Sequence, residues 1–206
     1  MREYLVFQLY GPFASWGDIA VGETRPSAMT PTKSAILGLV AAAVGIRRPN
    51  TARNDEQREL WECEHQKLVE GYGIATRVDV SGLLLLDYHT TESPRGKGFM
   101  TRYEEVQTVK LQKMEGNFKG TILSRREYRQ DSFCAVALWS KEGAPYTFSK
   151  LQHHLIYPEF LLYLGRKACP PSLPLNPKIT QSETIENALN IIPFPPEPRV
   201  FFDHLK

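Results

Sequence analysis

The densest group of residues suited to binding an anion is the sequence SRREYRQD, residues 124–131. In an extended strand, Arg125 and Arg129 share one face, while Arg126 and Tyr128 share the other. Guanidinium groups bind phosphate through paired hydrogen bonds, and aromatic rings stack on unpaired bases. The pattern therefore fits an RNA-binding strand. A solvated edge strand, kept from aggregating by its charges, explains the same residues.

A second candidate phosphate site lies where a loop that contains Arg25 meets a helix beginning near Thr32, Lys33 and Ser34. The free N–H groups of a helix N-terminus, a hydroxyl and a lysine together suit a phosphate. The glycine pattern of a Walker A loop is missing, so a nucleotide-hydrolysis loop is not expected. A simple helix cap is the alternative explanation.

A third candidate is the cationic pair Arg166-Lys167, which follows Tyr163-Leu164-Gly165. A strand that ends in glycine presents its backbone closely to a ligand, and the two cations then suit an RNA strand. A strand end with exposed charges is again the alternative.

Metal and acid–base chemistry have little support in the residue pattern. His153 and His154 are adjacent, so in a helix they point about 100° apart and cannot share a metal. No HxH, HExxH or clustered Cys/His motif occurs, and no metal or cofactor is expected. Tyr88 and His89, at the end of an expected strand, remain candidates for general acid–base cleavage of RNA.

The composition bounds the class of protein. The 206 residues are 42% hydrophobic and 23% charged, which is typical of a globular protein. The net charge is only +2, so an RNA surface must come from local clustering. Three cysteines distant in sequence favour a reducing cytoplasm over a disulfide framework. No apolar run reaches roughly 18 residues and no signal-peptide core is present, so no membrane association is expected.

The local clustering lies in residues 89–131, which hold nine cations, Lys110 and Lys113 among them, against six acids. Two short apolar groups, Val106–Leu111 and Thr121–Leu123, flank a glycine-containing stretch. This pattern predicts a β-hairpin that projects from the body and is low in apolar content because much of it leaves the core.

The order of the remaining elements predicts an α+β fold. Expected strands cover 2–10, 74–80, 83–88, 133–140 and 160–164; expected helices cover 30–46, 54–70, 149–157 and 181–190; residues 11–27 are an ordered loop, and a proline-rich tail follows residue 193. A ferredoxin-like, RNA-recognition-motif-like βαββαβ core fits this order. We expect a single domain over residues 1–206.

Four stretches together resemble the CRISPR-associated CasD family, the subunit of type I-E Cascade that caps the 5′ end of the guide RNA. They occur in the same order along the chain: LVFQLYGPFASWG (5–17), TRPSAMTPTKSAILGLVAAAVGI (24–46), SRREYRQDSFCAVAL (124–138) and YLGRKACP (163–170). Residues 47–123 and the C-terminal tail match less clearly.

The resemblance implies a single RAMP-type domain with a hairpin thumb within residues 89–123. It implies that the chain holds the 5′ handle of the CRISPR RNA in a cytoplasmic ribonucleoprotein for antiviral defense. The backbone subunit CasC and the large subunit CasA would be its partners, and target DNA would be met only indirectly. In type I-E systems CasE cuts the precursor RNA, so the resemblance implies that this chain is not an enzyme.

Two other functions remain open. A related branch in type I-C systems cleaves precursor RNA without metal, using a Tyr, a Lys and a His, and Tyr88 and His89 would be the candidates here. No Lys-His pair occurs in the chain, which favours the non-enzymatic function. A pure protein-interaction module is the third possibility, supported by the proline-rich tail and by Phe201 and Phe202.

Overall fold

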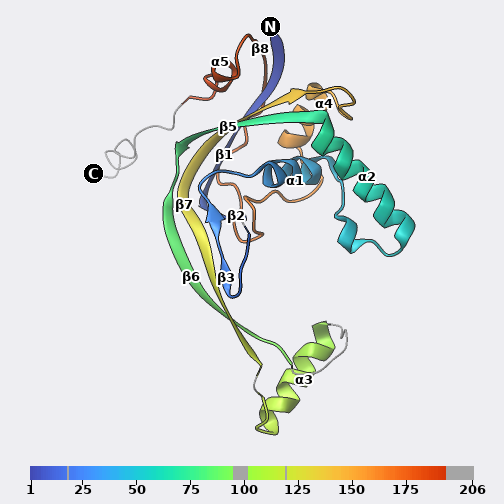
Figure 1. The fold of residues 1–206 in the computed structure, drawn as a ribbon, viewed down its shortest axis with the longest axis vertical. Helices are drawn as coiled ribbons and strands as arrows, with labels where there is room; N and C mark the ends of the chain where they lie inside the picture. Colours follow the sequence, from blue (N-terminus) through green and yellow to red (C-terminus); the bar gives the residue numbers. More distant parts are fainter. Residues whose placement is uncertain (18, 95–101, 119, 194–206) are drawn as a thin grey trace.

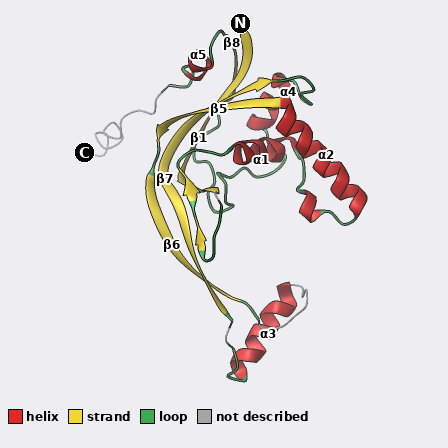
Figure 2. Cartoon of the chain, viewed as in Figure 1, coloured by secondary structure: helices red, strands yellow, loops and turns green. Residues whose placement is uncertain are grey.

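The computed structural model describes residues 1–17, 19–94, 102–118 and 120–193. Its elements are β1 (Arg2–Ala14), β2 (Trp16–Gly17), β3 (Thr24–Arg25), β4 (Ser27–Ala28), α1 (Lys33–Val44), the 3-10 turn η1 (Pro49–Thr51), α2 (Asp55–Gly71), β5 (Tyr72–Val80), β6 (Leu83–Glu92), α3 (Arg102–Met114), β7 (Thr121–Ser140), α4 (Phe148–Ile156), β8 (Lys178–Ser182) and α5 (Ile185–Leu189). The mixture of helices and one large sheet confirms the expected α+β class (Figure 1, Figure 2).

The 20-residue strand β7 organises the six-stranded sheet. Along one edge it pairs antiparallel with β1, from Leu5 opposite Leu138 to Ala14 opposite Arg129, and β8 then pairs with β1. Along the other edge it pairs first with β5 and then with β6. The short β3 adds a parallel pair beside Arg125 and Arg126. A separate two-stranded ribbon joins β2 to β4.

Alternation along β1 and β7 builds a separate core on each face of the sheet. Leu5, Phe7 and Leu9 face the larger cluster, which includes the buried residues of α1, α2 and α4. Tyr4 and Val6 face a smaller cluster that α5 covers. The expected strand over residues 2–10 and the expected covered strand over 133–140 are therefore confirmed. Such alternation is what a sheet covered on both faces requires.

Polar side chains cap the helices where the sequence indicates. Thr32 accepts from the amide of Ala35 and begins α1, which ends at Gly45 with a left-handed φ of 85°. Asn54 begins α2 in the same way. Along α2, Leu68 and Gly71 are buried, whereas Leu60 is 58% exposed. This helix therefore packs on the body mainly through its C-terminal end.

A projecting arm leaves the body along β6 and residues 121–130 of β7, and α3 lies at its end (Figure 1). The paired strands of this arm are residues 83–92 and 121–130, so only the second expected strand, Thr121–Leu123, lies in it. The expected strand through Val106–Leu111 is wrong, because residues 102–114 form a helix. Glu, Gln, Lys, Leu and Met dominate this segment, and acids in the first turn with Lys113 in the last stabilise the helix dipole.

Three other expectations need correction. Residues 160–164 form no strand, because the Phe160 amide donates to the Ala42 carbonyl at the end of α1 instead of to a sheet. Residues 11–27 are not all loop, since β1 continues to Ala14 and three short strands follow. The expected helix over 181–190 is reduced to α5, because residues 178–182 pair with β1 as β8.

Several expected features lie outside the described residues. They are residues 95–101 and 119 of the expected hairpin, and the tail with Pro195, Pro196, Pro198, Phe201 and Phe202. Within the described segments, no helix is both long and apolar enough to cross a bilayer.

A buried ion pair fastens α5 to the sheet. The Arg77 guanidinium donates to both carboxylate oxygens of Asp79, at 2.6 and 2.9 Å, and the Asp79 side chain is only 1% exposed. The same guanidinium donates to the carbonyls of Leu189 and Ile192 at 3.0 and 2.8 Å. Arg77 therefore ties the carbonyl groups at and just beyond the C-terminal end of α5 to strand β5.

We expect Arg77→Met to lower the free energy of unfolding by about 3–5 kcal/mol, because it leaves the Asp79 carboxylate buried without its partner. Urea denaturation followed by circular dichroism measures this change. The double variant Arg77→Met/Asp79→Leu removes both charges, so it is expected to lose less than the single variant. A double variant less stable than the single variant would contradict this account of the anchor.

Candidate nucleic-acid interface

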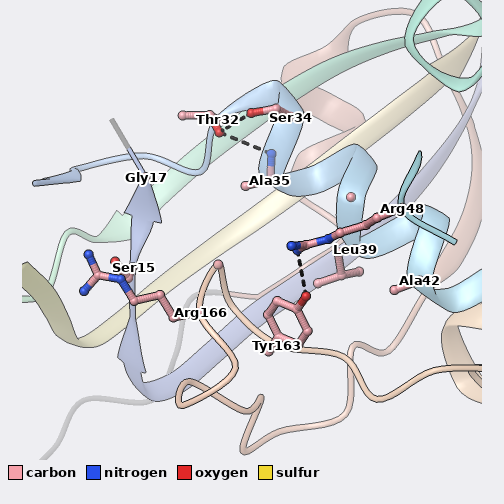
Figure 3. Close-up of a pocket in the computed structure, with 12 residues that line it drawn as sticks. Ser15, Gly17, Thr32, Ser34, Ala35, Leu39, Ala42, Arg48, Tyr163 and Arg166 are labelled. Atoms are coloured by element: carbon pink, nitrogen blue, oxygen red, sulfur yellow. Dashed lines mark hydrogen bonds between the residues drawn. The ribbon is translucent and has the colours of Figure 1, made fainter. Parts of the chain in front are cut away.

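A pocket of about 240 Å³ opens where the start of α1, the end of β1 with β2, and residues 163–170 meet (Figure 3). We call residues 163–170 the strap. The lining residues are Ser15, Gly17, Thr32, Ser34, Ala35, Gly38, Leu39, Ala42, Arg48, Tyr163, Gly165 and Arg166. The fold thus brings together Thr32 and Ser34 from the second predicted site and Arg166 from the third.

One face of α1 forms the floor of the pocket. Ala35, Gly38, Leu39 and Ala42 recur at spacings of three and four residues, so they lie together on the helix surface. The floor is therefore apolar and built mainly from small side chains. Polar groups from Ser15, the helix start and the strap surround it.

The hydroxyls at the start of α1 face the pocket, whereas Lys33 does not line it. Thr32 Oγ1 accepts from the Ala35 amide at 3.2 Å and lies 3.0 Å from Ser34 Oγ. Lys33 Nζ donates to the Val69 carbonyl at 2.9 Å and so ties α1 to α2. Among the three adjacent residues predicted from sequence, the two hydroxyls form the pocket wall and the lysine contacts the neighbouring helix.

The strap approaches the end of β1 too closely for any side chain at Gly165. The Ser15 amide donates to the Leu164 carbonyl at 2.9 Å. A Cβ at Gly165 would lie 1.7 Å from the Ser15 carbonyl oxygen, and φ there is +88°. Both the contact and the backbone angle require glycine. Gly165 is thus needed to place the following arginine.

Arg166 is held in place by three contacts. Its guanidinium donates to the carbonyls of Glu127 and Arg25, both at 3.1 Å. Its Cζ lies 4.8 Å from the centroid of the Tyr128 ring. Arg25 in turn folds back and donates to the Gly22 and Thr24 carbonyls. Residues from the three candidate sites that were predicted separately from sequence therefore meet at the Arg166 guanidinium.

Arg48 and Tyr163 close another side of the pocket. Arg48 Nη2 donates to the Tyr163 hydroxyl at 2.8 Å, although the residues are 115 positions apart in the chain (Figure 3). A hydroxyl that accepts one hydrogen bond keeps its own proton to donate. The pair therefore offers a donor at the pocket rim.

In the basic stretch of β7, residues 124–131, some side chains contact the protein and others are exposed to solvent. Arg126 Nε donates to Ser124 Oγ, and Arg129 Nη2 donates to the Ser27 carbonyl, both at 3.3 Å. Tyr128 is half-buried against Phe13. Arg125 is exposed. Arg125 is therefore placed to meet a phosphate from solvent, and the other two arginines also contact the protein itself.

The remaining predicted cations do not line the pocket. Lys110 is exposed on α3. Lys113, also on α3, donates to Glu92 on β6 and lies 5.4 Å from the Phe118 ring centroid. Lys167 is exposed on the strap but does not line the pocket. Lys113 thus anchors α3 to the arm, while Lys110 and Lys167 are accessible.

The candidate acid–base residues lie on opposite faces of β6. Consecutive strand residues point in opposite directions, so Tyr88 and His89 do not face one reacting group together. His89 Nδ1 is 3.8 Å from Asp87 Oδ2 on the same face. In the described ranges no group of three or more His, Cys, Asp and Glu side chains is placed to hold a metal.

Cys169 of the strap is buried and unreactive. Burial raises the pKa of its thiol, and the neighbouring Arg166 opposes that shift only in part. A protonated, buried thiol is a poor nucleophile. We assign Cys169 to packing of the strap.

Sequence reasoning assigned no site role to several lining residues, namely Ser15, Gly17, Ala35, Gly38, Leu39, Ala42 and Arg48. Most of them carry no local signal in the sequence. The contact between Arg48 and Tyr163, for example, depends on the tertiary fold. Gly38 is the exception. A glycine inside an otherwise apolar helix is unfavourable and points to a packing or ligand requirement.

Comparison with known proteins gives consistent matches over most of the chain. A family model described as CRISPR-associated protein (Cas_Cas5) matches residues 4–204. The chain is 33% identical over 193 residues to the CRISPR system Cascade subunit CasD of Escherichia coli (strain K12), covering 92% of this chain and 76% of that protein.

Two solved structures are also similar. One is a chain of a CRISPR RNA-guided surveillance complex, with a TM-score of 0.57 and 25% identity, covering 84% of this chain and 61% of that one. The other is described as the crystal structure of Cas protein. Its TM-score is 0.53 and its identity 25%, and the match covers 90% of this chain and 69% of that one. The chain therefore spans less than two thirds of the first matched structure.

We expect Arg166→Ala to lower the free energy of unfolding by about 1.5–3 kcal/mol, because charge-assisted hydrogen bonds to two carbonyls are lost. Arg166→Lys is expected to recover little of this, since an ammonium cannot reproduce the planar fork or its stacking on Tyr128. Thermal and urea unfolding measure both variants, with Lys167→Ala as the matched control on the strap. Full stability of Arg166→Lys would show that charge alone suffices.

Proposed function

This chain belongs to the CRISPR-associated protein (Cas_Cas5) family, and we propose that it is the Cascade subunit that binds the 5′ handle of CRISPR RNA. It is a component of a Cascade-type ribonucleoprotein. The observation that carries the proposal is the pocket, where hydroxyls at a helix start, Arg48 and Arg166 converge beside an apolar floor. Such a combination suits an unpaired nucleotide, which offers a phosphate and a flat base.

Two kinds of contact are proposed for the RNA. The pocket would take a nucleotide, with Thr32, Ser34 and Arg166 near it. The exposed cations Arg125 and Lys110 on the arm would meet phosphates, with Arg126, Arg129, Lys113, Arg25, Lys33 and Lys167 supporting or flanking them. The local excess of cations on the arm of a chain with a net charge of only +2 supports this division.

A ferredoxin-like arrangement, in one RAMP-type domain over residues 1–206, is part of the proposal. Taking β5 and β6 as one interrupted strand, the chain order β1, α1, β5–β6, β7, α4, β8 is βαββαβ. The spatial order β5–β6, β7, β1, β8 is antiparallel throughout. We propose that the arm is the thumb of this family.

We further propose that the subunit is not an enzyme and acts in the cytoplasm. It would contact the backbone subunit CasC and the large subunit CasA, and target DNA only through the assembled complex. The opposed directions of Tyr88 and His89 support the absence of RNA cleavage. The relative named as a Cascade subunit supports a structural role in the complex.

We expect Arg125→Ala and Lys110→Ala each to weaken RNA binding and to reduce the salt dependence. For single-stranded RNA, each lost phosphate contact should lower the slope of log K against log salt by about 0.7. Filter binding over a range of salt concentrations measures this. Lys67→Ala on α2 is the control, because that exposed lysine lies on another element and is expected to leave the slope unchanged. Unchanged slopes for both arm variants would count against the arm as an RNA surface.

The RNA itself is identified by isolating the tagged full-length chain and sequencing nuclease-protected fragments. CRISPR RNAs that share a common 5′ end, recovered with other Cascade subunits, are expected. Random fragments or no RNA would refute handle binding.

Cleavage is tested by incubating the chain with repeat-containing RNA in EDTA, where no discrete product is expected. A product that disappears in His89→Ala would establish the endoribonuclease alternative.

A further inference from the structure

Gly17 and Gly38 differ from the other glycines in the described segments. A Cβ built on either residue would meet no heavy atom within 4 Å, and neither has a φ in the left-handed region. Each remaining described glycine has a positive φ or an atom that a Cβ would contact too closely. Thus neither packing against the described residues nor backbone geometry requires glycine at these two positions.

Both of these glycines line the pocket. Gly17 belongs to β2 and Gly38 to the middle of α1, two elements that border the cavity from different sides (Figure 3). Gly165 also lines the pocket, but its φ of +88° and its contact with Ser15 explain it without a ligand. The two glycines that the described fold does not require therefore both line this pocket, where the absence of a side chain leaves open space.

Gly38 is also unfavourable where it stands. Glycine in a helix interior is less stable than alanine, and the space beside Gly38 would accept a methyl group. Because packing in the described structure does not require this destabilising glycine, its presence points to a requirement from a bound ligand. A close approach by a ligand is the physical requirement that an absent side chain satisfies.

We propose that Gly17 and Gly38 keep the pocket open for a single unpaired RNA base, which lies flat against the small-residue face of α1. This inference rests on the proposed function and assigns the occupant of its pocket. The apolar floor of Ala35, Leu39 and Ala42 suits the face of a ring. The cavity of about 240 Å³ is smaller than the roughly 300–1,000 Å³ typical of sites for larger ligands, which fits a ligand as small as a single base.

The rim supplies groups for the edge of that base. The Tyr163 hydroxyl accepts from Arg48 and retains a proton to donate. The exposed Ser34 Oγ, which lies 3.0 Å from Thr32 Oγ1, can accept. A donor and an acceptor beside an apolar floor provide edge recognition together with stacking, which is how proteins select splayed RNA bases.

The test uses the full-length chain and a synthetic copy of the RNA recovered with it. A second set of RNAs replaces one nucleotide at a time with an abasic residue. Gly38→Leu and Gly17→Leu fill the pocket from two sides, and Gly38→Ala adds one methyl group with little effect on folding. Gln66→Leu, on the exposed face of α2, adds the same side chain away from the pocket and serves as the control.

We expect the unaltered chain to lose about tenfold in affinity when one particular nucleotide is abasic, a typical value for a lost stacked base. Gly38→Leu should lose about tenfold with the intact RNA and show no further loss at that same abasic position. The control should bind as the unaltered chain does. Gly38→Ala should raise the melting temperature by about 2–4 °C, because alanine is the better helix former and nothing obstructs it.

Three results would overturn the inference. Normal affinity in both leucine variants would show that the pocket is not occupied, even though RNA still binds elsewhere. Additive losses at every abasic position would show that the occupant is not a base. A lower melting temperature for Gly38→Ala would show that the fold itself requires glycine. Failure of the unaltered chain and of the control to bind RNA would instead refute the proposed function, and the inference with it.

Discussion

The pairing of β7 on both of its edges is the constraint on which the rest of the structure depends. Residues 133–138 are held between β1 and β5, and their side chains alternate between two cores. A shift of one residue would move every one of those side chains to the wrong face, so the register is fixed. The same strand continues into the arm, and the register of the core therefore also sets which side chains the arm presents at residues 121–130.

The interface is consequently built more from fixed geometry than from free charge. Arg166 and Arg25 make their hydrogen bonds to carbonyls of the protein, and Lys33 and Lys113 fasten helices. Their charges still act at short range, but contacts within the protein fix their positions. Preorganised groups lose little conformational entropy on binding. The proposed RNA contact would therefore not depend on the net charge of the chain, which is only +2.

Local features of the sequence were sufficient to predict the capped helices α1 and α2 and the covered strands, because caps and alternation act within a few residues. Residues 160–164 were predicted as a strand because of their apolar run, yet the Phe160 amide donates to the Ala42 carbonyl of α1 and the Leu164 amide donates to the Cys169 carbonyl. The helix α3 was missed because short apolar groups were given more weight than helix propensity. The pocket depends on pairs such as Arg48 and Tyr163, which only the tertiary fold brings together.

The pocket and the arm are coupled through neighbouring residues of one strand. Glu127 and Tyr128 of β7 hold Arg166 at the pocket, while Arg125, two residues before Glu127, is exposed on the arm. A rigid strand in register with β6 keeps these positions at a constant separation. An RNA strand that contacts both would thus be held at two points whose spacing belongs to the fold. The length of β7 between the pocket and Arg125 would then favour an RNA strand whose course fits that spacing. No base-specific contact would be required at every nucleotide.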